Sequence, residues 1–477
     1  MTNQISTKDY RNLFVGLDAE VPLLNGQHTR YINFDNAAST PALKSSQIAV
    51  NDFLTYYSSV HRGTGFKSQL STYIYEETRD TVLRFVGANP ITHTCIFGKN
   101  TTEAINKLAR RIPIDETRDI VLTSGMEHHS NDLPWRAVAK TVHIKLTPNG
   151  CLDEDDFDQQ LKNYGDRIAL VAITGASNVT GNINPIHRLA EKTHAVGAQI
   201  LVDCAQLAPH RKINMRSLND PGHLDYVTIS AHKMYAPFGS GALIGRRDNF
   251  ERGAPDQRGG GTVEIVTLDS VVWAGPPERD EAGSPNTVGA VALAAAINQL
   301  VVIDMHKVAE HETLLIQSAL EQMRAIPNLV LYGGNCSSQH EDRLGVIPFL
   351  IKDINHFLVA AILGYEFGIG VRNGCFCAHP YILHLLGLSA EKAEAVRDQM
   401  LAGDRSSMPG LIRVSFGLYN TLDEVEILVE ALNKIARGEY QGEYAQHKQT
   451  GEFTPHGWTP EFENYFSLKA IDNVSLG

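Results

Sequence analysis

The sequence lacks the features that mark several protein classes. Lysine and arginine number 42 against 54 aspartate and glutamate residues, which gives a formal net charge of -12, and no basic block stands out. This balance argues against a nucleic-acid-binding protein. No apolar run is long enough to cross a bilayer, and the first residues lack a basic segment followed by an apolar one. We therefore expect no nucleic-acid partner, no membrane and a cytoplasmic location.

Cysteine is scarce. Six residues in a chain of this length do not make a disulfide framework, so a reduced cytosolic setting is the default. Cys375 and Cys377 form a Cys-x-Cys pair, but no second Cys or His pair supplies the two further ligands of a zinc site, and we expect no metal. The remaining cysteines are interpreted as ordinary buried or loop residues: Cys95, Cys151, Cys204 and Cys336.

A large first region alternates short apolar runs with amphipathic stretches. It extends from about Tyr31 to about Val302 and contains a helical pattern at 186–195. Strands alternating with helices predict a mainly parallel sheet with helices on both faces. The strand candidates are 119–123, 169–174, 199–203 and 226–230.

A second region begins near Met305 and mixes the two patterns differently. It predicts helices at 305–323, 355–363 and 422–436 and strands at 346–351 and 412–416. These elements are typical of a smaller α+β domain. After Arg437 the chain is polar and aromatic, and we expect an extended tail packed on the body, because its aromatic side chains would otherwise be exposed. The predicted division is 31–302 for the large domain, 1–30 with 303–436 for the small domain, and 437–477 for the tail.

Asp203 and Lys233 each follow an apolar run at the predicted carboxyl end of a strand, where open α/β sheets bind ligands. The pair suits pyridoxal phosphate. That cofactor needs an amine to bind its aldehyde and an anion to keep its pyridine nitrogen protonated, so that the ring can accept electrons. A lysine alone would usually lie on the surface. The apolar strand before Lys233 and the glycine-containing segment 237–244 after it favour a ligand site.

Other residues fit the same cofactor. Thr101 or Thr102 begins a predicted helix, whose free N–H groups could bind phosphate, although most such starts are only caps. Ser230 and His232 flank the lysine and could reach the same phosphate. A histidine in the segment 126–131 could stack on the pyridine ring and relay protons; a solvated loop histidine is the alternative.

Fewer features of the sequence indicate which residues bind the substrate. Asn178 and Gln206 each follow a strand and could hydrogen-bond the ring hydroxyl or the substrate. Arg413, on an apolar strand, could hold the carboxylate of an amino-acid substrate with two parallel hydrogen bonds. The segment Arg372–Cys377 places thiols beside a glycine, where a nucleophile could be exposed. Together these residues indicate an enzyme that moves sulfur.

Taken as a set, and in order over roughly residues 30 to 436, ten segments resemble the class V, fold type I pyridoxal-phosphate enzymes, and within them the group II cysteine desulfurases. The matching segments are 34–38, 60–63, 127–135, 177–181, 203–206, 230–233, 259–262, 281–287, 372–377 and 413–420.

The resemblance implies a seven-stranded, mainly parallel sheet with helices on both faces, a smaller α+β domain, and a conversion of L-cysteine to L-alanine. Lys233 would bind the cofactor and remove the α-proton, and Cys377 would take the sulfur as a persulfide for an acceptor, which could be a protein. A homodimer with shared active sites is implied as well, because Thr262 would reach the phosphate of the neighbouring subunit. The other implied roles are pyridine-nitrogen partner for Asp203, ring stacking for His128, contacts near the ring hydroxyl and substrate for Asn178 and Gln206, phosphate binding for Thr101 or Thr102, Ser230 and His232, carboxylate binding for Arg413, and the active-site entrance for Arg372 and His61.

The chain also departs from the family. Asn373 and the pair Cys375–Phe376 replace the expected residues before Cys377, and the string Gly-Cys-Phe-Cys is similar to the desulfurase-like domain of molybdenum cofactor sulfurases. The stretch 385–408 is longer than the family needs, and the tail is extra. These departures leave the sulfur acceptor open, with Cys375 either a second relay thiol or a mere neighbour.

Three other functions compete with desulfuration. A C–S lyase on the same fold would release pyruvate and ammonia and need no nucleophilic cysteine. A class V aminotransferase or epimerase leaves the Arg-x-Gly-x-x-Cys motif unexplained. An idle scaffold that keeps the cofactor for stability is disfavoured by the intact Lys233, Asp203 and Arg413.

Overall fold

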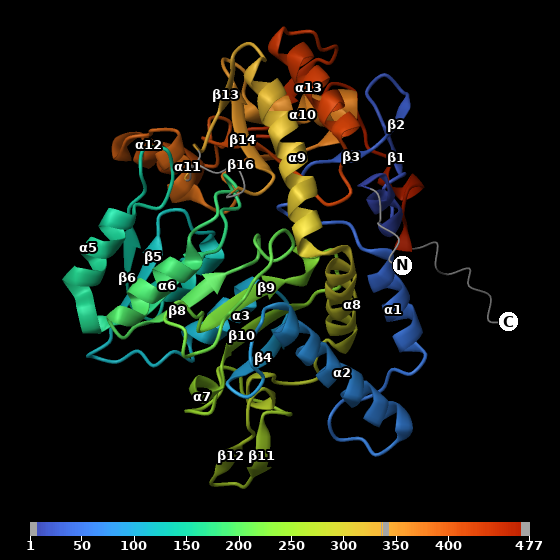
Figure 1. Ribbon diagram of the computed structural model, residues 1–477. Coiled ribbons are helices and arrows are strands. Elements are labelled where there is room, and N and C mark those ends of the chain that lie inside the picture. Colours follow the sequence, from blue (N-terminus) through green and yellow to red (C-terminus); the bar gives the residue numbers. More distant parts are fainter. Residues whose placement is uncertain (1–6, 335, 337–342, 469–477) are drawn as a thin grey trace, which may run out of the picture.

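The computed structural model describes residues 7–334, 336 and 343–468 of the 477-residue chain (Figure 1). Two sheets organise it. The larger has seven strands in the order β4-β10-β9-β8-β7-β5-β6, of which only β10 runs against its neighbours β4 and β9. The strand bounds are β4 (His93–Gly98), β5 (Ile120–Ser124), β6 (Lys140–Ile144), β7 (Ile168–Thr174), β8 (Gln199–Asp203), β9 (Tyr226–Ser230) and β10 (Gly241–Arg246).

The central strands are buried on both faces because their side chains alternate between two apolar clusters. Ile200 and Val202 belong to one cluster, and Leu201 between them belongs to the other. The mainly parallel sheet and its helices on both faces were predicted from the alternation of strand and helix patterns, and the structure confirms them. The helices around this sheet are α1 (Lys44–Leu54), α2 (Phe66–Phe85), α3 (Thr101–Ala109), α4 (Leu133–Arg136), α5 (Glu154–Tyr164), α6 (Ile186–Ala195), α7 (Arg247–Phe250) and α8 (Thr287–Ile303).

The smaller sheet has the order β13-β14-β17-β16 and is antiparallel throughout. Long helices pack on it and bury a separate apolar cluster, so the predicted α+β region is present. The bounds are β13 (Leu329–Leu331), β14 (Val346–Ile351), β16 (Arg372–Gly374), β17 (Leu411–Ser415), α9 (Met305–Arg324), α10 (His356–Phe367), α11 (His379–Leu385), α12 (Ala390–Leu401) and α13 (Leu422–Ala436). Where the boundaries between domains fall stays a prediction.

Short paired segments complete the fold. The strand β3 (Ile32–Asn33) runs parallel to β15 (Ile369–Gly370) in a separate two-stranded sheet. A bridge between Asp35 and Ser415 of β17 then attaches the start of the chain to the small sheet. The hairpin β1 (Glu20–Pro22) and β2 (His28–Arg30) precedes it. A second hairpin, β11 (Val263–Val266) and β12 (Val271–Trp273), projects away from the small sheet at the far end of the molecule (Figure 1).

The tail after Arg437 forms a hairpin, β18 (Tyr444–Gln446) and β19 (Phe453–Pro455), instead of the extended segment predicted. It packs on α10, where the Glu366 carboxylate accepts hydrogen bonds from the Tyr444 hydroxyl and from the amide of Gly442. Trp458 also packs edge-on against Tyr365, at 5.4 Å between ring centroids. Burial of the tail aromatics ends there, because Phe462 and Phe466 are both 74% exposed. Residues 469–477 lie outside the described part.

Membrane-spanning character is weak in the described residues. No single helix there has both the length and the apolarity to cross a bilayer, and only α8 and α9 taken together pass on length and composition, across a 78° bend. Most of α8 is buried against α1 and α2.

Candidate active site

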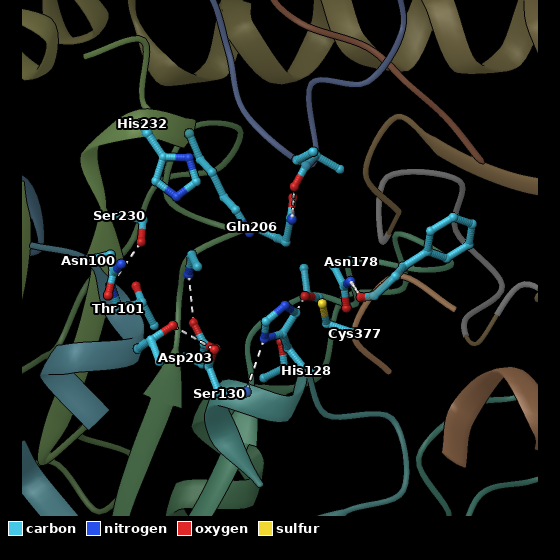
Figure 2. Close-up of a pocket in the computed structure, with 18 of the residues that line it drawn as sticks. Asn100, Thr101, His128, Ser130, Asn178, Asp203, Gln206, Ser230, His232 and Cys377 are labelled. Carbon is cyan, nitrogen blue, oxygen red and sulfur yellow. Dashed lines mark hydrogen bonds between the residues drawn. The ribbon is translucent and has the colours of Figure 1, made fainter. Parts of the chain in front are cut away.

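Residues that were predicted separately from the sequence line one cavity at the carboxyl edge of the large sheet (Figure 2). Asp203 ends β8, Ser230 ends β9, and Lys233 follows in a 3-10 turn, since each apolar strand stops where the chain becomes polar. The loop after the small-sheet strand β16 closes the cavity from the other side with Phe376 and Cys377. The lining includes Asn100, Thr101, Thr102, His128, Ser130, Asn178, Asp203, Gln206, Ser230, His232, Lys233, Arg372, Phe376, Cys377 and Arg413.

One end of the cavity suits a phosphate group. Helix α3 begins here, with Asn100 as its cap, and its first-turn amides carry the positive end of the helix dipole. The Thr101 amide donates to the Ser230 hydroxyl at 2.9 Å, and the Thr101 hydroxyl is buried with no hydrogen-bond partner among the described residues. Thr102 shares a hydrogen bond of 2.7 Å with Ser130. A buried hydroxyl without a partner beside a helix start is what a phosphate oxygen would satisfy.

Another part of the cavity suits a protonated pyridine nitrogen. Asp203 is buried, and burial raises its pKa, although the amide of Ala205 and the Lys233 cation oppose the rise. A pyridinium N–H against this carboxylate would supply the missing countercharge. Burial also lowers the pKa of His128 to about 3, with Lys233 adding to the effect, so its ring is neutral at neutral pH. A neutral ring can stack on a cationic pyridine without charge repulsion.

Lys233 lines the same cavity as these residues. Burial lowers its pKa to about 8, and the Asp203 carboxylate only partly offsets that effect. About a tenth of this amine is therefore unprotonated at pH 7, far more than in an ordinary lysine, and the unprotonated form is the one that attacks an aldehyde and accepts a proton. The residues present thus fit pyridoxal phosphate at its phosphate, its ring nitrogen and its aldehyde.

Arg413 extends from β17 of the small sheet into the same cavity. It is buried, and its guanidinium donates to the Asn178 carbonyl and to the Asp35 carboxylate, both at 2.9 Å. Arg372 lies opposite Arg413 in the strand register, 3.8 Å from the second Asp35 oxygen. Two cations flanking one carboxylate form a site to which a substrate carboxylate could bind by displacing Asp35.

The two cysteines of the Cys-x-Cys pair have different environments. Cys377 is exposed to the cavity, whereas Cys375 is buried and its thiol donates to the Pro409 carbonyl at 3.1 Å. Burial raises the pKa of Cys375 to about 12, so its thiol is protonated and a poor nucleophile. The structure favours Cys375 as a neighbour and not as a relay thiol.

One cysteine expectation was wrong. Cys151 and Cys336 are not ordinary loop thiols, because they form a disulfide across 185 residues of sequence, with Cα atoms 5.5 Å apart. Each sits in a loop whose partner comes from a distant part of the chain, so neither spacing nor local pattern indicated the bond. Cys95 and Cys204 are free and buried, as expected.

Two predicted site residues lie outside the cavity. His61 is exposed, with its ring edge-on to Tyr75 at 5.8 Å. Thr262 is buried next to the β11–β12 hairpin, and its hydroxyl donates to the Gly259 carbonyl at 2.7 Å. Gln206 and Asn178 do line the cavity, but their amides donate to protein carbonyls, those of Ala37 at 2.7 Å and of Phe376 at 2.8 Å respectively.

The sequence-based prediction missed other members of the site. Asp35 was part of a quoted motif but received no role, and its contact with Arg413 depends on a bridge between the chain start and β17. Phe376 places its ring 4.7 Å from the Arg413 guanidinium carbon, a cation–π contact.

Outside the cavity, His194, His223 and Asp225 are close enough to share an ion, yet Arg246 already lies 3.4 Å from the Asp225 carboxylate.

Comparison with known proteins places this geometry in a family. The "Aminotransferase class-V" profile matches residues 32–428. The chain is 34% identical to a probable cysteine desulfurase of Halalkalibacterium halodurans, over 90% of this chain and 98% of that one, and 33% identical to a cysteine desulfurase of Dickeya dadantii, over 88% and 96%. A cysteine desulfurase structure from Thermococcus onnurineus superposes with a TM-score of 0.74 at 32% identity, covering 86% of this chain and 95% of the other. The chain is a member of the class V aminotransferase family of pyridoxal-phosphate enzymes, on the branch that holds the cysteine desulfurases.

Proposed function

We propose that this protein is a pyridoxal-phosphate-dependent cysteine desulfurase that converts L-cysteine to L-alanine, with Cys377 as the nucleophile. One observation carries the proposal: the cavity holds Lys233 and Asp203 from the large sheet together with Arg413 and Cys377 from the small one. A lysine–aspartate pair alone would serve any enzyme of this family. The cysteine exposed to the same cavity is what a sulfur-moving enzyme additionally needs.

Each residue has a task in this reaction. Arg413 binds the substrate carboxylate, and the neutral Lys233 amine takes the α-proton. When bound, pyridoxal phosphate supplies an electron sink for the negative charge at the α-carbon. The Cys377 thiolate then attacks the substrate sulfur, the carbon–sulfur bond breaks, and its electron pair stays on the β-carbon, which takes a proton to become the methyl group of alanine. Lys233 returns the proton to the α-carbon. Cys377 is left as a persulfide.

The persulfide must then pass to an acceptor, and we propose a protein or another thiol that reaches Cys377 from solvent. Exposure of Cys377 supports this, because an acceptor needs access to the outer sulfur. We also propose a homodimer with shared active sites. The β11–β12 hairpin presents Ile265, Val266 and Val272, each more than half exposed, as an apolar surface that a second copy would cover. Thr262, buried beside this hairpin with its hydroxyl on the Gly259 carbonyl, would have to turn outward to reach the partner's phosphate site.

Product analysis tests the proposal. Purified wild type, Cys377→Ala and Cys375→Ala are incubated with L-cysteine and dithiothreitol, and alanine, sulfide, pyruvate and ammonia are measured. Alanine and sulfide in equal amounts, abolished in Cys377→Ala and kept within about threefold in Cys375→Ala, is the expected result. Pyruvate and ammonia that persist in Cys377→Ala would refute the persulfide mechanism and identify a C–S lyase.

A further inference from the structure

The nucleophile loop has an unusual backbone. Phe376 and Cys377 are consecutive non-glycine residues with positive φ, 51° and 54°, in the left-handed region that side chains rarely adopt. Two such residues in a row are held only where surrounding contacts enforce them. The contacts that enforce this pair therefore decide where the Cys377 thiol points.

Three contacts fix the loop from the large-sheet side. The Asn178 amide donates to the Phe376 carbonyl at 2.8 Å, and the backbone N–H of His129 donates to the Cys377 carbonyl at 2.8 Å. On the other side of the cysteine, the backbone N–H of His379 donates to His129 Nε2 at 3.3 Å. His129 thus holds the chain both at Cys377 and two residues later.

The side chain of His379 completes the contact. Its ring stacks on that of His129, with centroids 5.0 Å apart and planes 6° from parallel, and its Nδ1 lies 3.2 Å from His129 Nε2. Burial lowers the pKa of both histidines, so the pair is neutral at neutral pH and Nε2 of His129 can accept. His129 itself begins the 3-10 turn after β5, next to His128, so its contacts tie the loop to the edge of the large sheet.

We propose that His129 is a positioning residue which, through Nε2 and with His379 stacked on it, keeps Cys377 in the left-handed conformation that presents its thiol to the cavity. The proposal rests on the assignment of Cys377 as the nucleophile. His129 touches neither substrate nor cofactor in this role. It acts on the reaction only through the orientation of Cys377, so its loss should slow sulfur attack without weakening cysteine binding at Arg413.

The test compares holoenzyme variants. His129→Ala removes the Nε2 acceptor, His129→Gln offers a side-chain oxygen in its place, His379→Ala removes only the stacked ring, and His306→Ala, an exposed histidine on α9, is the matched control. We expect kcat to fall about tenfold in His129→Ala at unchanged KM, which corresponds to one lost neutral hydrogen bond. His129→Gln should restore most of it, His379→Ala should lose about threefold, and His306→Ala should equal wild type.

A second readout does not depend on activity. Hydrogen exchange of the segment 372–384 and the rate of Cys377 alkylation by iodoacetamide should both rise in His129→Ala, because the loop then leaves the left-handed conformation. If wild type makes no alanine while these two readouts respond as expected, the function is wrong and the positioning role stands. Unchanged exchange and alkylation in a folded His129→Ala, or a loss confined to KM, would overturn the positioning role. If His129→Ala does not fold, His379→Ala decides by the same exchange and alkylation readouts, with His129→Gln as the variant expected to stay near wild type.

Discussion

The state of the Lys233 amine before the cofactor binds offers a quantitative test of the site. Burial lowers its pKa to about 8, Asp203 works against that shift, and Arg413 adds to it. Only the neutral amine attacks an aldehyde. At pH 7.5 the neutral fraction is about 0.24 for a pKa of 8 and about 0.001 for an ordinary lysine at 10.5, a ratio of roughly 240. Cofactor capture by the apoenzyme should therefore be fast near neutral pH and half-maximal near pH 8.

The assay is stopped-flow absorbance after mixing apoenzyme with excess pyridoxal phosphate between pH 7 and 9.5. Burial lowers the pKa of His128 to about 3 and that of His232 to about 4, so neither changes charge in this window. Arg413→Met removes a cation and should move the midpoint up, whereas Asp203→Asn removes an anion and should move it down. Arg405→Met, a cation outside the cavity, is the control. A wild-type midpoint at pH 10 or above, or coincident midpoints in the two charge variants, would refute the reasoning.

Three further predictions concern stability and assembly. Burial opposes ionisation of Glu312, but His210 and Arg211 hold its pKa at about 2. Its carboxylate therefore adds roughly 3 kcal/mol to the free energy of unfolding, which is present above pH 4.5 and is lost as pH falls through 2. The Tm of Glu312→Gln should lie well below that of wild type at pH 7, with a difference that closes in acid, and a constant difference would contradict this. The Cys151–Cys336 disulfide closes a 185-residue separation, a loop worth up to about 5 kcal/mol, so dithiothreitol should lower the Tm of wild type to that of Cys336→Ser and leave the variant unchanged. Val272→Glu should convert the dimer to monomer in sedimentation velocity, while Leu314→Glu, at an exposed position of α9, should not; a monomeric wild type would remove the shared-site proposal.

Local signals were enough to predict the large sheet and its functional edge. Asp203 and Lys233 each follow a continuous apolar run, and such a run is a buried parallel strand whose carboxyl end opens on a ligand site. The Arg372–Cys377 segment was likewise recognisable, because it places two thiols within three residues, beside a glycine, in a chain with only six cysteines. These inferences need only neighbours in sequence, which is why they could be made without the structure.

Other features depend on segments that meet only after folding. The Cys151–Cys336 bond joins two loops from different regions, and the Arg413–Asp35 ion pair joins the chain start to β17. The buried Cys375 thiol donates to the carbonyl of Pro409, 34 residues away. Each of these contacts is decided by tertiary packing, on which residue spacing carries no information.

The site is divided between two sheets, with Lys233 and Asp203 on one and Arg413 with the Cys377 loop on the other. The distance between the Lys233 amine and the Cys377 thiol therefore depends on how the two sheets are placed relative to each other, and not on one local loop. Two contacts connect the parts of the chain that carry these sheets and restrict the distance between them. They are the Glu312–Arg211 ion pair and the Cys151–Cys336 disulfide. Substitutions at these contacts, far from any reacting atom, could therefore change that distance and with it the turnover rate.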